Sequence, residues 1–380
     1  MSRSELHIAL CTDGVFPHAV GGMQRHSRLL AEHMATIPGV RLTVIHPHAA
    51  PIYPPALGIH EVGVPPIDTD KFYLGQLWKY SGDVAAALDR ERPDVIIAQG
   101  FSVWKHIDRY RTRLMVHPHG LEMFQGITLR DRLLGTPFRI TLRWIMRRSA
   151  MCISLGGRLN TMLERCVRGA RTEVVVIPNA VELSSAPVDY PLGEGPLRLL
   201  FVGRFAFNKG LDLLLAVARK LEAEGHHDRV QFKLVGDGPL MASIRAEGVP
   251  ANVEILGKLD DDALDQAYRW SHALLLPTRF EGMPTVVLEA MARGRAILVS
   301  DVGATAELVD DTNGFLLPKG DEAALYSAID SLALMDGAAR EAMGRASLRR
   351  VEERYAWNKV AERTVEVSQK LAQREMQQRE

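Results

Sequence analysis

The chain alternates between short apolar runs and longer stretches in which apolar and polar residues mix. In the first half, the runs that indicate buried strands lie at 6–11, 42–45, 95–98, 114–116, 151–153 and 174–177. In the second half, they lie at 197–202, 232–235, 253–256, 273–276, 297–299 and 315–317. Between them, apolar residues recur at spacings of three and four, as at 25–34 and 211–222, which predicts helices. This alternation predicts an α/β fold with parallel sheets covered by helices on both faces.

The alternation is interrupted between 178 and 197, where the sequence has four prolines and no periodicity. We therefore predict a linker at 181–196, between a Rossmann-like domain at 1–180 and a second one at 197–356. The last stretch, 357–380, is predicted to be a long polar helix. Doubly wound domains bind ligands beyond the carboxyl ends of their strands, so we expect a ligand-binding cleft between the two domains.

Composition agrees with a soluble two-domain protein. The 380 residues are 47% apolar and 24% charged, which is enough for two cores and excludes a disordered or fibrous chain. Three scattered cysteines, Cys11, Cys152 and Cys166, argue against a disulfide framework and a structural zinc site. The first apolar run is too short for a signal peptide or a membrane span, so we expect a cytoplasmic protein.

The net charge of zero hides an asymmetry between the two halves. Residues 1–180 hold 22 Lys and Arg against 15 Asp and Glu, and residues 181–380 hold 24 against 31. Much of the basic excess lies at 130–148, where six arginines and one acid are interleaved with apolar residues. This stretch predicts a helix, which either has a solvated basic face or lies on an anionic membrane surface.

A glycine pair in the first half is a candidate phosphate-binding loop. The run that ends at Cys11 is followed by a loop containing Gly21 and Gly22, and a helical pattern begins there. Paired glycines before a helix let backbone N–H groups approach a phosphate. Glycine pairs in loops are also common in simple turns, so this loop alone does not distinguish the two.

A second loop, in the second half, carries two cations. The run 197–202 is followed by Gly203 and Arg204, and Lys209 comes just before the next helical pattern. Arg offers a planar fork and Lys a point charge, so the pair suits a pyrophosphate at the carboxyl end of a strand. A solvated loop with two incidental cations is the alternative.

The segment 277–294 carries the strongest signal. A strand runs into a turn, Pro284 marks the start of a helix, and the free N–H groups of the first helical turn can bind an anion. Glu281 precedes this helix, and Glu289 lies inside it among apolar residues, where a carboxylate is costly without a partner such as ribose hydroxyls. The donor-binding residues expected from this segment are Gly282, Met283, Pro284, Thr285, Val286 and Glu289.

A histidine follows a strand of the first half. The run 114–116 leads into His117, His119 and Gly120. A histidine at a strand end can donate a hydrogen bond to a sugar hydroxyl or to a developing charge. We favour His119 for this role, with His117 as the alternative, although a single histidine is more often structural.

In their order along the chain, these segments resemble the retaining two-domain (GT-B) glycosyltransferases of family 4. The matching segments are Gly21-Gly22, His119-Gly120, Pro178-Asn179, Gly203-Arg204 with Lys209-Gly210, and Glu281-x7-Glu289 around Gly282-Met283-Pro284. The resemblance covers nearly the whole chain and implies a GT-B fold whose C-terminal helix packs back on the first domain. Ala180 stands where the family has glycine after Pro-Asn, which weakens any role for that turn.

The resemblance also implies a mechanism. Arg204 and Lys209 would stabilise the leaving diphosphate of a nucleotide sugar. Glu289 would hold the ribose and Glu281 the sugar hydroxyls, while His119 would lie near the anomeric carbon. No carboxylate is placed as a nucleophile, which fits same-face (retaining) hexosyl transfer. Fixed cations and helix N–H groups cover the developing charge, so no metal and no other cofactor is expected.

The expected partners are a UDP- or GDP-sugar and a lipid-linked or saccharide acceptor, as in bacterial surface polysaccharide or glycolipid synthesis, with no nucleic acid. The backbone near Lys258 and Leu259 is expected to contact the base. The basic first half suggests an anionic or lipid-linked acceptor. The expected location is the cytoplasm, with peripheral binding to the cytoplasmic face of the inner membrane if the 130–148 surface binds lipid. An Asp-x-Asp metal site would need Asp68-Thr69-Asp70, which follows a poor strand and is predicted to be a loop.

Other classes of protein remain open at this stage. The GT-B fold also hosts sugar-nucleotide epimerases, phosphorylases and transferases with small soluble acceptors, and fold alone does not separate them. A non-catalytic membrane-bound sugar sensor would not need to keep the leaving-group cations. A nicotinamide oxidoreductase is disfavoured, because no GxGxxG follows the first strand.

Overall fold

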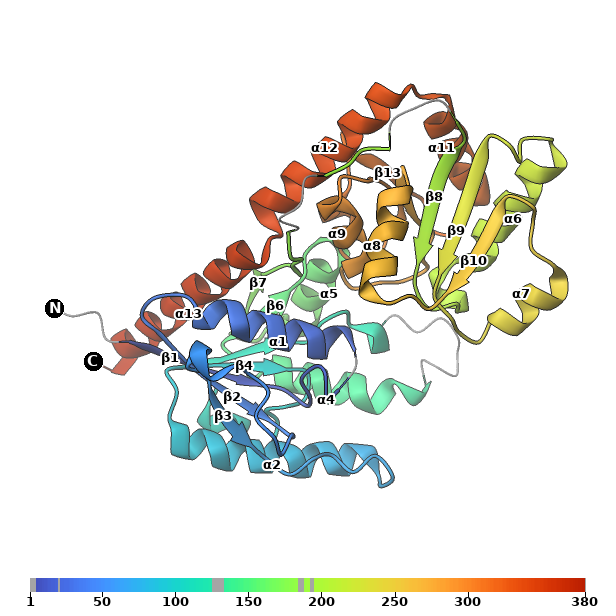
Figure 1. Ribbon diagram of the computed structural model, residues 1–380. Helices are drawn as coiled ribbons and strands as arrows, with labels where there is room; N and C mark the ends of the chain where they lie inside the picture. The colour runs from blue at the N-terminus through green and yellow to red at the C-terminus, as the bar shows by residue number, and fades with distance from the viewer. Residues whose placement is uncertain (1–4, 20, 125–132, 184–187, 192–194, 380) are drawn as a thin grey trace. The chain divides into compact units, whose positions relative to one another are not determined.

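The structure is a computed structural model that describes residues 5–19, 21–124, 133–183, 188–191 and 195–379. It divides into two compact units (Figure 1). The N-terminal unit is Met1–Ala180 together with Trp357–Glu380, and the C-terminal unit is Val181–Ala356.

The N-terminal unit is built on one parallel sheet. Its strands are β1 (Leu6–Cys11), β2 (Val40–His46), β3 (His60–Gly63), β4 (Val95–Gln99), β5 (Leu114–His117), β6 (Met151–Ser154) and β7 (Glu173–Val176). They lie in the order β3-β2-β1-β4-β5-β6-β7. The central strands are buried on both faces, which explains their continuous apolar runs. The order changes direction between β1 and β4, the position where doubly wound sheets bind ligands.

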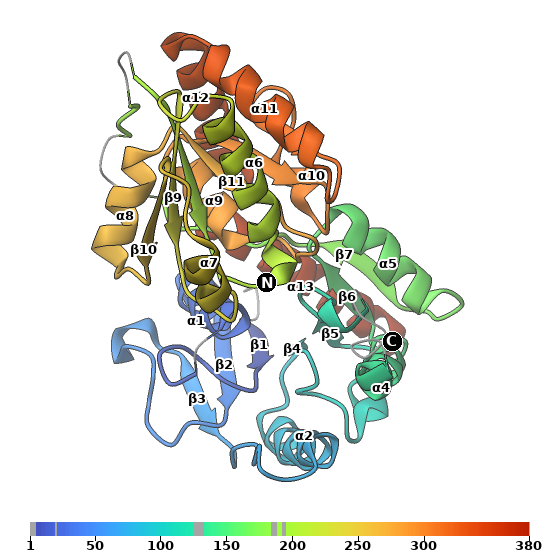
Figure 2. The same ribbon diagram turned by 90° about the vertical axis from the view of Figure 1, so that its right-hand side faces the viewer.

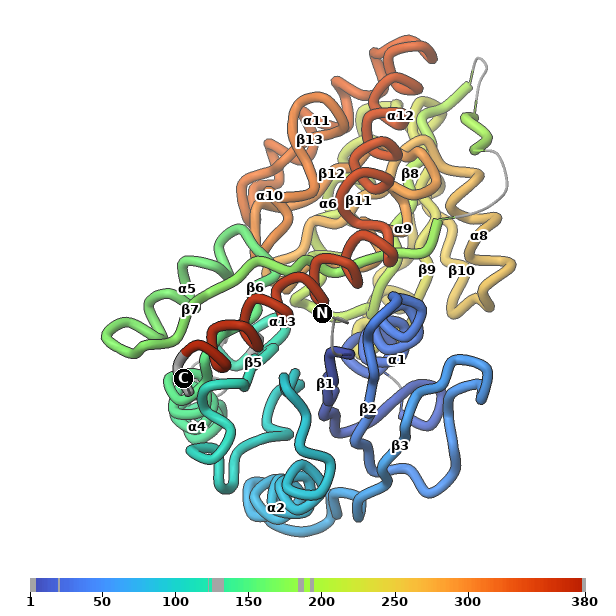
Figure 3. The backbone as a smooth tube through the Cα atoms, turned by 90° about the vertical axis from the view of Figure 1, so that its left-hand side faces the viewer, coloured from blue at the N-terminus to red at the C-terminus, as the bar shows by residue number. Residues whose placement is uncertain are grey.

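Helices cover this sheet, and one of them comes from the end of the chain. They are α1 (Gly22–Ala35), α2 (Tyr73–Glu91), α4 (Thr136–Met146), α5 (Gly157–Val167) and α13 (Trp357–Arg379), with 3-10 turns η1 (Pro55–Leu57), η2 (Ile107–Arg109) and η3 (Glu122–Phe124). Figure 3 traces α13 as the dark red end of the chain. One face of this helix buries Trp357, Val360 and Val365 in the same core as Leu30 and Met34 of α1. This apolar stripe holds an otherwise polar helix against the N-terminal unit.

The C-terminal unit repeats the same topology with a second parallel sheet. Its strands are β8 (Leu197–Val202), β9 (Val230–Val235), β10 (Val253–Gly257), β11 (Ala273–Leu276), β12 (Ala296–Ser300) and β13 (Gly314–Leu317). They lie in the order β10-β9-β8-β11-β12-β13, so the change of direction falls between β8 and β11. In both sheets the first two crossovers run one way and the later ones run the other.

The helices of the C-terminal unit lie on both faces of its sheet. They are η4 (Phe207–Lys209), α6 (Leu211–Ala223), α7 (Met241–Glu247), α8 (Asp261–Trp270), α9 (Thr285–Ala292), α10 (Thr305–Leu308), α11 (Glu322–Leu334) and α12 (Gly337–Arg354). Figure 2 shows α6 and α11 on one side and α8, α9 and α12 on the other. This division follows from right-handed crossovers in a sheet whose order reverses.

Every predicted apolar run overlaps a strand. The observed elements differ from the prediction at three places, described next. β3 was not predicted, because it is a half-buried edge strand without an apolar run. The predicted run at 174–177 is shifted by one residue from β7. The predicted helix at 130–148 is α4, which is shorter, and Arg130, Asp131 and Arg132 lie outside the described residues.

The structure also accounts for two remaining features of the sequence. Cys11, Cys152 and Cys166 are buried free thiols, as their scattered positions predicted. Within the described ranges, no helix has both the length and the apolarity that crossing a bilayer requires.

Candidate functional site

Two loops meet at the point where the strand order of the C-terminal sheet reverses. One follows β8 and carries Arg204 and Lys209, and the other follows β11 and leads into α9. The backbone carbonyl of Asn208 accepts hydrogen bonds from the Thr278 hydroxyl, at 2.9 Å, and from the Arg279 N–H, at 2.7 Å. The two loops are therefore fixed to each other at the position where such a sheet binds ligands.

Lys209 and Glu281 form an ion pair between these loops. The ammonium group of Lys209 donates to Oε1 of Glu281, which lies 3.3 Å from the Thr278 hydroxyl. The two side chains retain 23% and 13% of their accessible surface, respectively. The structure thus brings together two residues that are 72 positions apart and that the sequence assigned to one site.

Arg204 has a fixed backbone and an exposed side chain. Phe205 is fully buried beside it, and its N–H donates to the carbonyl of Asp237 at 2.9 Å. Gly236, at φ 136°, lies so close that a Cβ there would be 1.9 Å from the carbonyl oxygen of Gly203. The Arg204 side chain forms no hydrogen bond or ion pair with any described residue. A guanidinium on a rigid loop is suited to binding an anion.

The helix α9 begins at this same edge, and in its first turn the N–H of Val287 donates to the carbonyl of Pro284 at 3.1 Å. Its N-cap is Pro284, which has extended backbone angles and no side chain that can cap the helix. The first turn contains no acidic residue; Thr285 is exposed and Val286 is half-buried. The free N–H groups and the positive end of the helix dipole make this terminus a favourable place for an anion.

Gly303 fixes the approach to α9. It has φ 56°, and a Cβ there would lie 2.2 Å from the carbonyl oxygen of Glu281 and 2.4 Å from that of Gly282. The N–H of Ala304 donates to the Gly282 carbonyl at 2.8 Å. Gly282 is half-buried, and Met283 next to it is buried. The sequence did not single out Gly303, because its role depends on contact with a segment some twenty residues earlier in the chain.

Glu289 lies one turn into α9 and has a partner within the protein. Its Oε2 accepts a hydrogen bond from the hydroxyl of Tyr268, at 2.9 Å. Burial and the neighbouring Glu289 carboxylate keep the pKa of Tyr268 well above its usual range. Tyr268 therefore offsets part of the cost of burying this carboxylate without a ligand, and the ribose role of Glu289 stays a prediction. The second carboxylate oxygen of Glu289 has no hydrogen-bond partner among the described residues.

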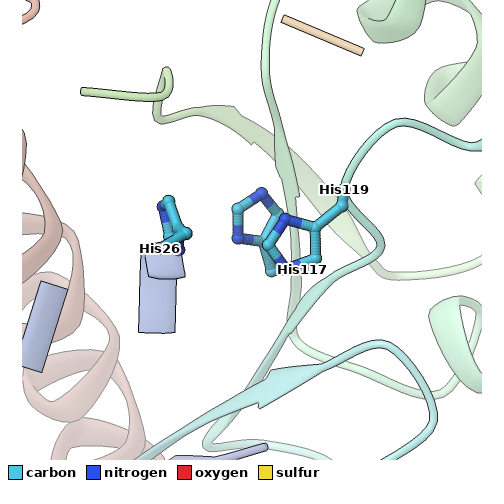
Figure 4. Close-up of side chains that lie close together, drawn as sticks. All are labelled: His26, His117 and His119. Carbon is cyan, nitrogen blue, oxygen red and sulfur yellow. The ribbon is translucent and has the colours of Figure 1, made fainter. Parts of the chain in front are cut away.

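The corresponding edge of the N-terminal sheet carries histidines instead of cations. His119 lies two residues after β5 and has φ 56°, a left-handed conformation. Its Nε2 donates to Oε1 of Gln99, at the end of β4. Its ring stacks on that of His117, with centroids 3.9 Å apart. His26 of α1 meets both rings edge-on, with centroids 5.2 and 5.4 Å away (Figure 4).

These imidazoles are neutral at physiological pH. Burial lowers the pKa of His26 to about 4, and the pKa of His119 well below its usual range. His117 behaves in the same way, because burial and its two neighbouring rings disfavour the charged form. His26 was not singled out by the sequence: nothing in a helical pattern shows which histidine will face a loop 90 positions later.

The paired glycines begin α1 beside this histidine group. Gly21 has an extended φ of 168°, and Gly22 would accommodate a Cβ with nothing within 4 Å. Among the described residues, no protein atom thus requires a glycine at position 22. The prediction that these glycines allow a phosphate to approach remains open, and Gly22 is the position at which substitution tests it.

The other sequence candidates lie elsewhere. Leu259 is half-buried in the loop between β10 and α8, at the carboxyl end of an edge strand. Asp68 forms a turn with the N–H of Asp70 at 3.1 Å and an ion pair with Lys71 at 2.7 Å. These contacts account for the Asp68 carboxylate within its own loop.

Two regions of the chain match different glycosyltransferase family models. Residues 20–185 match the model described as Glycosyltransferase Family 4, and residues 196–334 match Glycosyl transferases group 1. The two regions coincide with most of the N-terminal and the C-terminal sheet, respectively. The family models and the fold together define a GT-B glycosyltransferase architecture.

The chain is also similar in sequence to individual glycosyltransferases. The chain is 27% identical to glycogen synthase of Mycobacterium tuberculosis over 230 residues, which is 59% of this chain and 55% of that protein. The chain thus spans about half the length of the curated relatives that it matches.

Solved structures show the same fold over almost the whole chain. Sucrose-phosphate synthase from Thermosynechococcus elongatus superposes with a TM-score of 0.76 at 19% identity, covering 96% of this chain and 99% of that one. Anabaena Alr3699/HepE, solved with UDP and glucose, gives a TM-score of 0.65 at 16% identity, covering 95% and 98%.

Proposed function

We propose that this protein is a retaining glycosyltransferase that moves a hexose from a UDP- or GDP-sugar to a lipid-linked or saccharide acceptor. The observation that carries the proposal is the convergence of Arg204, Lys209 and the start of α9 where the C-terminal strand order reverses. Two cations and a helix N-terminus at one edge suit the paired phosphates of a nucleotide diphosphate. The UDP bound to the Anabaena relative supports a donor of this class.

The reaction breaks the bond between the anomeric carbon and the donor phosphate oxygen. The electron pair stays on the diphosphate, and the acceptor hydroxyl forms the new bond and loses a proton to that leaving group. Arg204 and Lys209 stabilise the negative charge that develops there. Fixed positive groups perform the task that a divalent cation would otherwise perform, so we propose transfer without a metal.

Glu281 and Glu289 orient the donor. Glu289 accepts from Tyr268 through one oxygen, which fixes the carboxylate so that the other oxygen can accept from a ribose hydroxyl. Glu281 is paired with Lys209. When the donor binds, the Lys209 ammonium is shared between Glu281 and phosphate oxygens, and Glu281 accepts from sugar hydroxyls.

His119 and the Gly21-Gly22 loop belong to the N-terminal unit, and we assign them to the sugar and the acceptor. Gln99 holds His119 with the proton on Nε2, since an amide oxygen only accepts. The neutral ring then offers an unprotonated Nδ1.

The experiment that tests the proposal measures nucleotide diphosphate release from UDP- and GDP-sugars, with and without acceptor glycans and lipids, in EDTA. Release that requires an acceptor, with an α-linked product from an α-linked donor, supports retaining transfer. A sugar-nucleotide epimerase would convert the donor without acceptor, and a phosphorylase would require inorganic phosphate. Activity that disappears in EDTA and returns with Mg²⁺ would refute the metal-free step.

We also propose that the N-terminal unit binds an anionic membrane surface where a lipid-linked acceptor resides. Around α4, Leu133, Leu134 and Ile140 each expose 65–66% of their surface. Phe72, beside the start of α2, exposes 78% of its surface. The ring centroid of its neighbour Tyr73 lies 6.1 Å from that of Phe138 of α4. Exposed apolar side chains next to basic ones are typical of interfacial binding.

The arginines of α4 do more than face solvent. Arg143 and Arg147 both donate to the carbonyl of Cys166, at 3.3 and 3.4 Å, and Arg147 also donates to that of Arg168, at 2.6 Å. They cap the C-terminal end of α5, so the expectation of a wholly free basic face is corrected. Reversing these charges would damage packing as well as any membrane contact.

A cleaner test changes the exposed apolar residues. Ile140→Asp with Leu134→Asp should abolish co-sedimentation with phosphatidylglycerol vesicles at low salt. Leu334→Asp, at a residue of the C-terminal unit that is 72% exposed, is the matched control and should leave co-sedimentation unchanged. Equal loss in both variants, or no vesicle binding by the unaltered protein, would end the membrane proposal.

A further inference from the structure

The strongest observation outside the proposed donor site is the group of three histidines in the N-terminal unit. One ring nitrogen of each of His26, His117 and His119 lies within 4.8 Å of the others. Figure 4 shows the ring of His26 opposite the overlapping rings of His117 and His119. His117 ends β5, His119 lies two residues after it, and His26 comes from α1, so the group is formed by tertiary structure and not by a local motif.

Two buried nitrogens of this group lack hydrogen-bond partners among the described residues. His26 and His117 are more than nine-tenths buried, and Nδ1 of His26 and Nε2 of His117 have no hydrogen-bond partner among the described residues. A buried nitrogen without a partner costs about 1–3 kcal/mol, which a ligand would recover. Gln99 fixes the proton of His119 on Nε2, which leaves the lone pair on its Nδ1.

We propose that His26, His117 and His119 form a binding site for a borderline transition-metal ion such as Zn²⁺, with an open fourth position. Imidazole nitrogens are favoured ligands of Zn²⁺, Ni²⁺ and Cu²⁺, and three protein ligands with one open position are common for Zn²⁺. Gln99 supplies the outer-shell acceptor that ligand histidines usually have. The metal is an occupant and not a cofactor of the proposed transfer.

Metal binding requires a small rearrangement. Zn–N bonds of about 2.0–2.1 Å place tetrahedral nitrogens closer together than 4.8 Å. His117 and His119 stack with their planes 24° apart, so their in-plane lone pairs lie in nearly parallel planes and do not converge on one ion across the stack. His119 lies in a loop and is half-buried, so rotation of its ring about χ2 can direct Nδ1 towards the other two nitrogens.

A second group of histidines in the same unit differs from the first in the availability of its ring nitrogens to a metal ion. The ring centroid of His48 lies 5.2 Å from that of His18 and 5.5 Å from that of His46. Two of these rings already use a nitrogen, because His46 Nε2 bonds Glu61 and His48 Nε2 accepts from the Val15 N–H, both at 2.9 Å. Occupied nitrogens cannot ligate a metal without breaking these bonds.

Titration of the metal-free full chain with Zn²⁺ tests the site, with Co²⁺ as a spectroscopic probe. We expect one ion per chain and an intense visible Co²⁺ band, which indicates four-coordinate geometry. His26→Gln, His117→Gln and His119→Gln should each weaken binding at least about tenfold, and His18→Gln, which removes an exposed ring, should not. Circular dichroism verifies that each variant folds.

No binding by the unaltered chain, or binding that all three variants retain, overturns the proposal. If a variant does not fold, Gln99→Leu replaces it: the three ligands remain, and affinity should fall by a smaller factor. A further expectation rests on the proposed function. Because Zn²⁺ would occupy His119, one equivalent of Zn²⁺ should inhibit sugar transfer, and EDTA should restore the activity. Metal binding without inhibition would refute only the role of His119, since the titration needs no activity.

Discussion

The two sheets have the same topology, but the segments at their carboxyl ends carry different side chains. In both, the strand order changes direction beside the first strand of the sheet. The C-terminal edge carries Arg204 and the ion pair of Lys209 with Glu281, whereas the N-terminal edge carries three neutral histidines. The backbone fixes where a ligand binds, and the side chains on these loops decide its charge.

The cations should make the largest difference between the two edges. Arg204→Ala and Lys209→Ala are each expected to lower kcat for sugar transfer by about 100-fold, because a fixed charge that stabilises the leaving group is lost. Steady-state kinetics with a saturating donor measures the effect. Arg219→Ala, which removes an exposed arginine on α6 of the same unit, should change kcat less than twofold.

A small effect of both substitutions would mean that the diphosphate binds elsewhere. Because the Arg204 side chain is exposed, its removal should not change stability, and an unaltered thermal unfolding curve distinguishes loss of chemistry from loss of fold.

Acid should act more strongly on the N-terminal unit. Burial lowers the pKa of six of its histidines, namely His7, His26, His46, His48, His117 and His119. In the C-terminal unit this holds for His272, whose pKa is lowered to about 4 by burial and by Arg198 and Arg340. A histidine with a lowered folded-state pKa binds its proton more readily when unfolded, so stability is lost as pH falls below 6.5.

For His26 alone, with a pKa of about 4 in the folded state, the loss at pH 5 is about 2 kcal/mol. Hydrogen exchange followed separately in the two units, at pH 7 and pH 5 in EDTA, measures the difference. His272→Gln should reduce the pH dependence of the C-terminal unit. Equal loss of hydrogen-exchange protection in both units would contradict the expectation that acid destabilises the N-terminal unit more.

Glu289 should have an intermediate effect on donor binding. Glu289→Ala is expected to raise KM for the nucleotide sugar about tenfold, because a charged acceptor for a hydroxyl pair is lost. Tyr268→Phe keeps the carboxylate and removes only the hydrogen bond that orients it, so a smaller increase in KM is expected. If KM is unchanged by Glu289→Ala, the carboxylate serves only its bond to Tyr268 and has no ribose role.

The smallest effect concerns the glycine pair of the N-terminal unit. Gly22→Ala meets no atom of a described residue within 4 Å and lies at the start of α1, so it should stabilise the unit by about 0.5 kcal/mol. If a substrate phosphate or sugar approaches this backbone, the same change should lower kcat/KM. Full activity in the stabilised variant would mean that the glycine pair only forms a turn and that no substrate contacts its backbone.

Local patterns predicted the strands well, because strands buried on both faces require continuous apolar runs. The motif from Glu281 to Glu289 was also readable, since a strand, a proline and a helix follow one another within a few residues. β3 escaped prediction because its burial is partial, and α4 is shorter than its basic, apolar pattern indicated. The arginines of that pattern cap α5, which no property of the 130–148 segment reveals.

The sequence by itself determined the α/β class, the positions of the parallel strands and the residue types available at their ends. Only the tertiary structure decided that Tyr268 holds Glu289, that Gly303 presses on the turn before α9, and that His26 joins His117 and His119. The physical reason is range: periodicity and capping act over a few residues, whereas the partner of a buried polar group is chosen by packing between segments far apart in the chain.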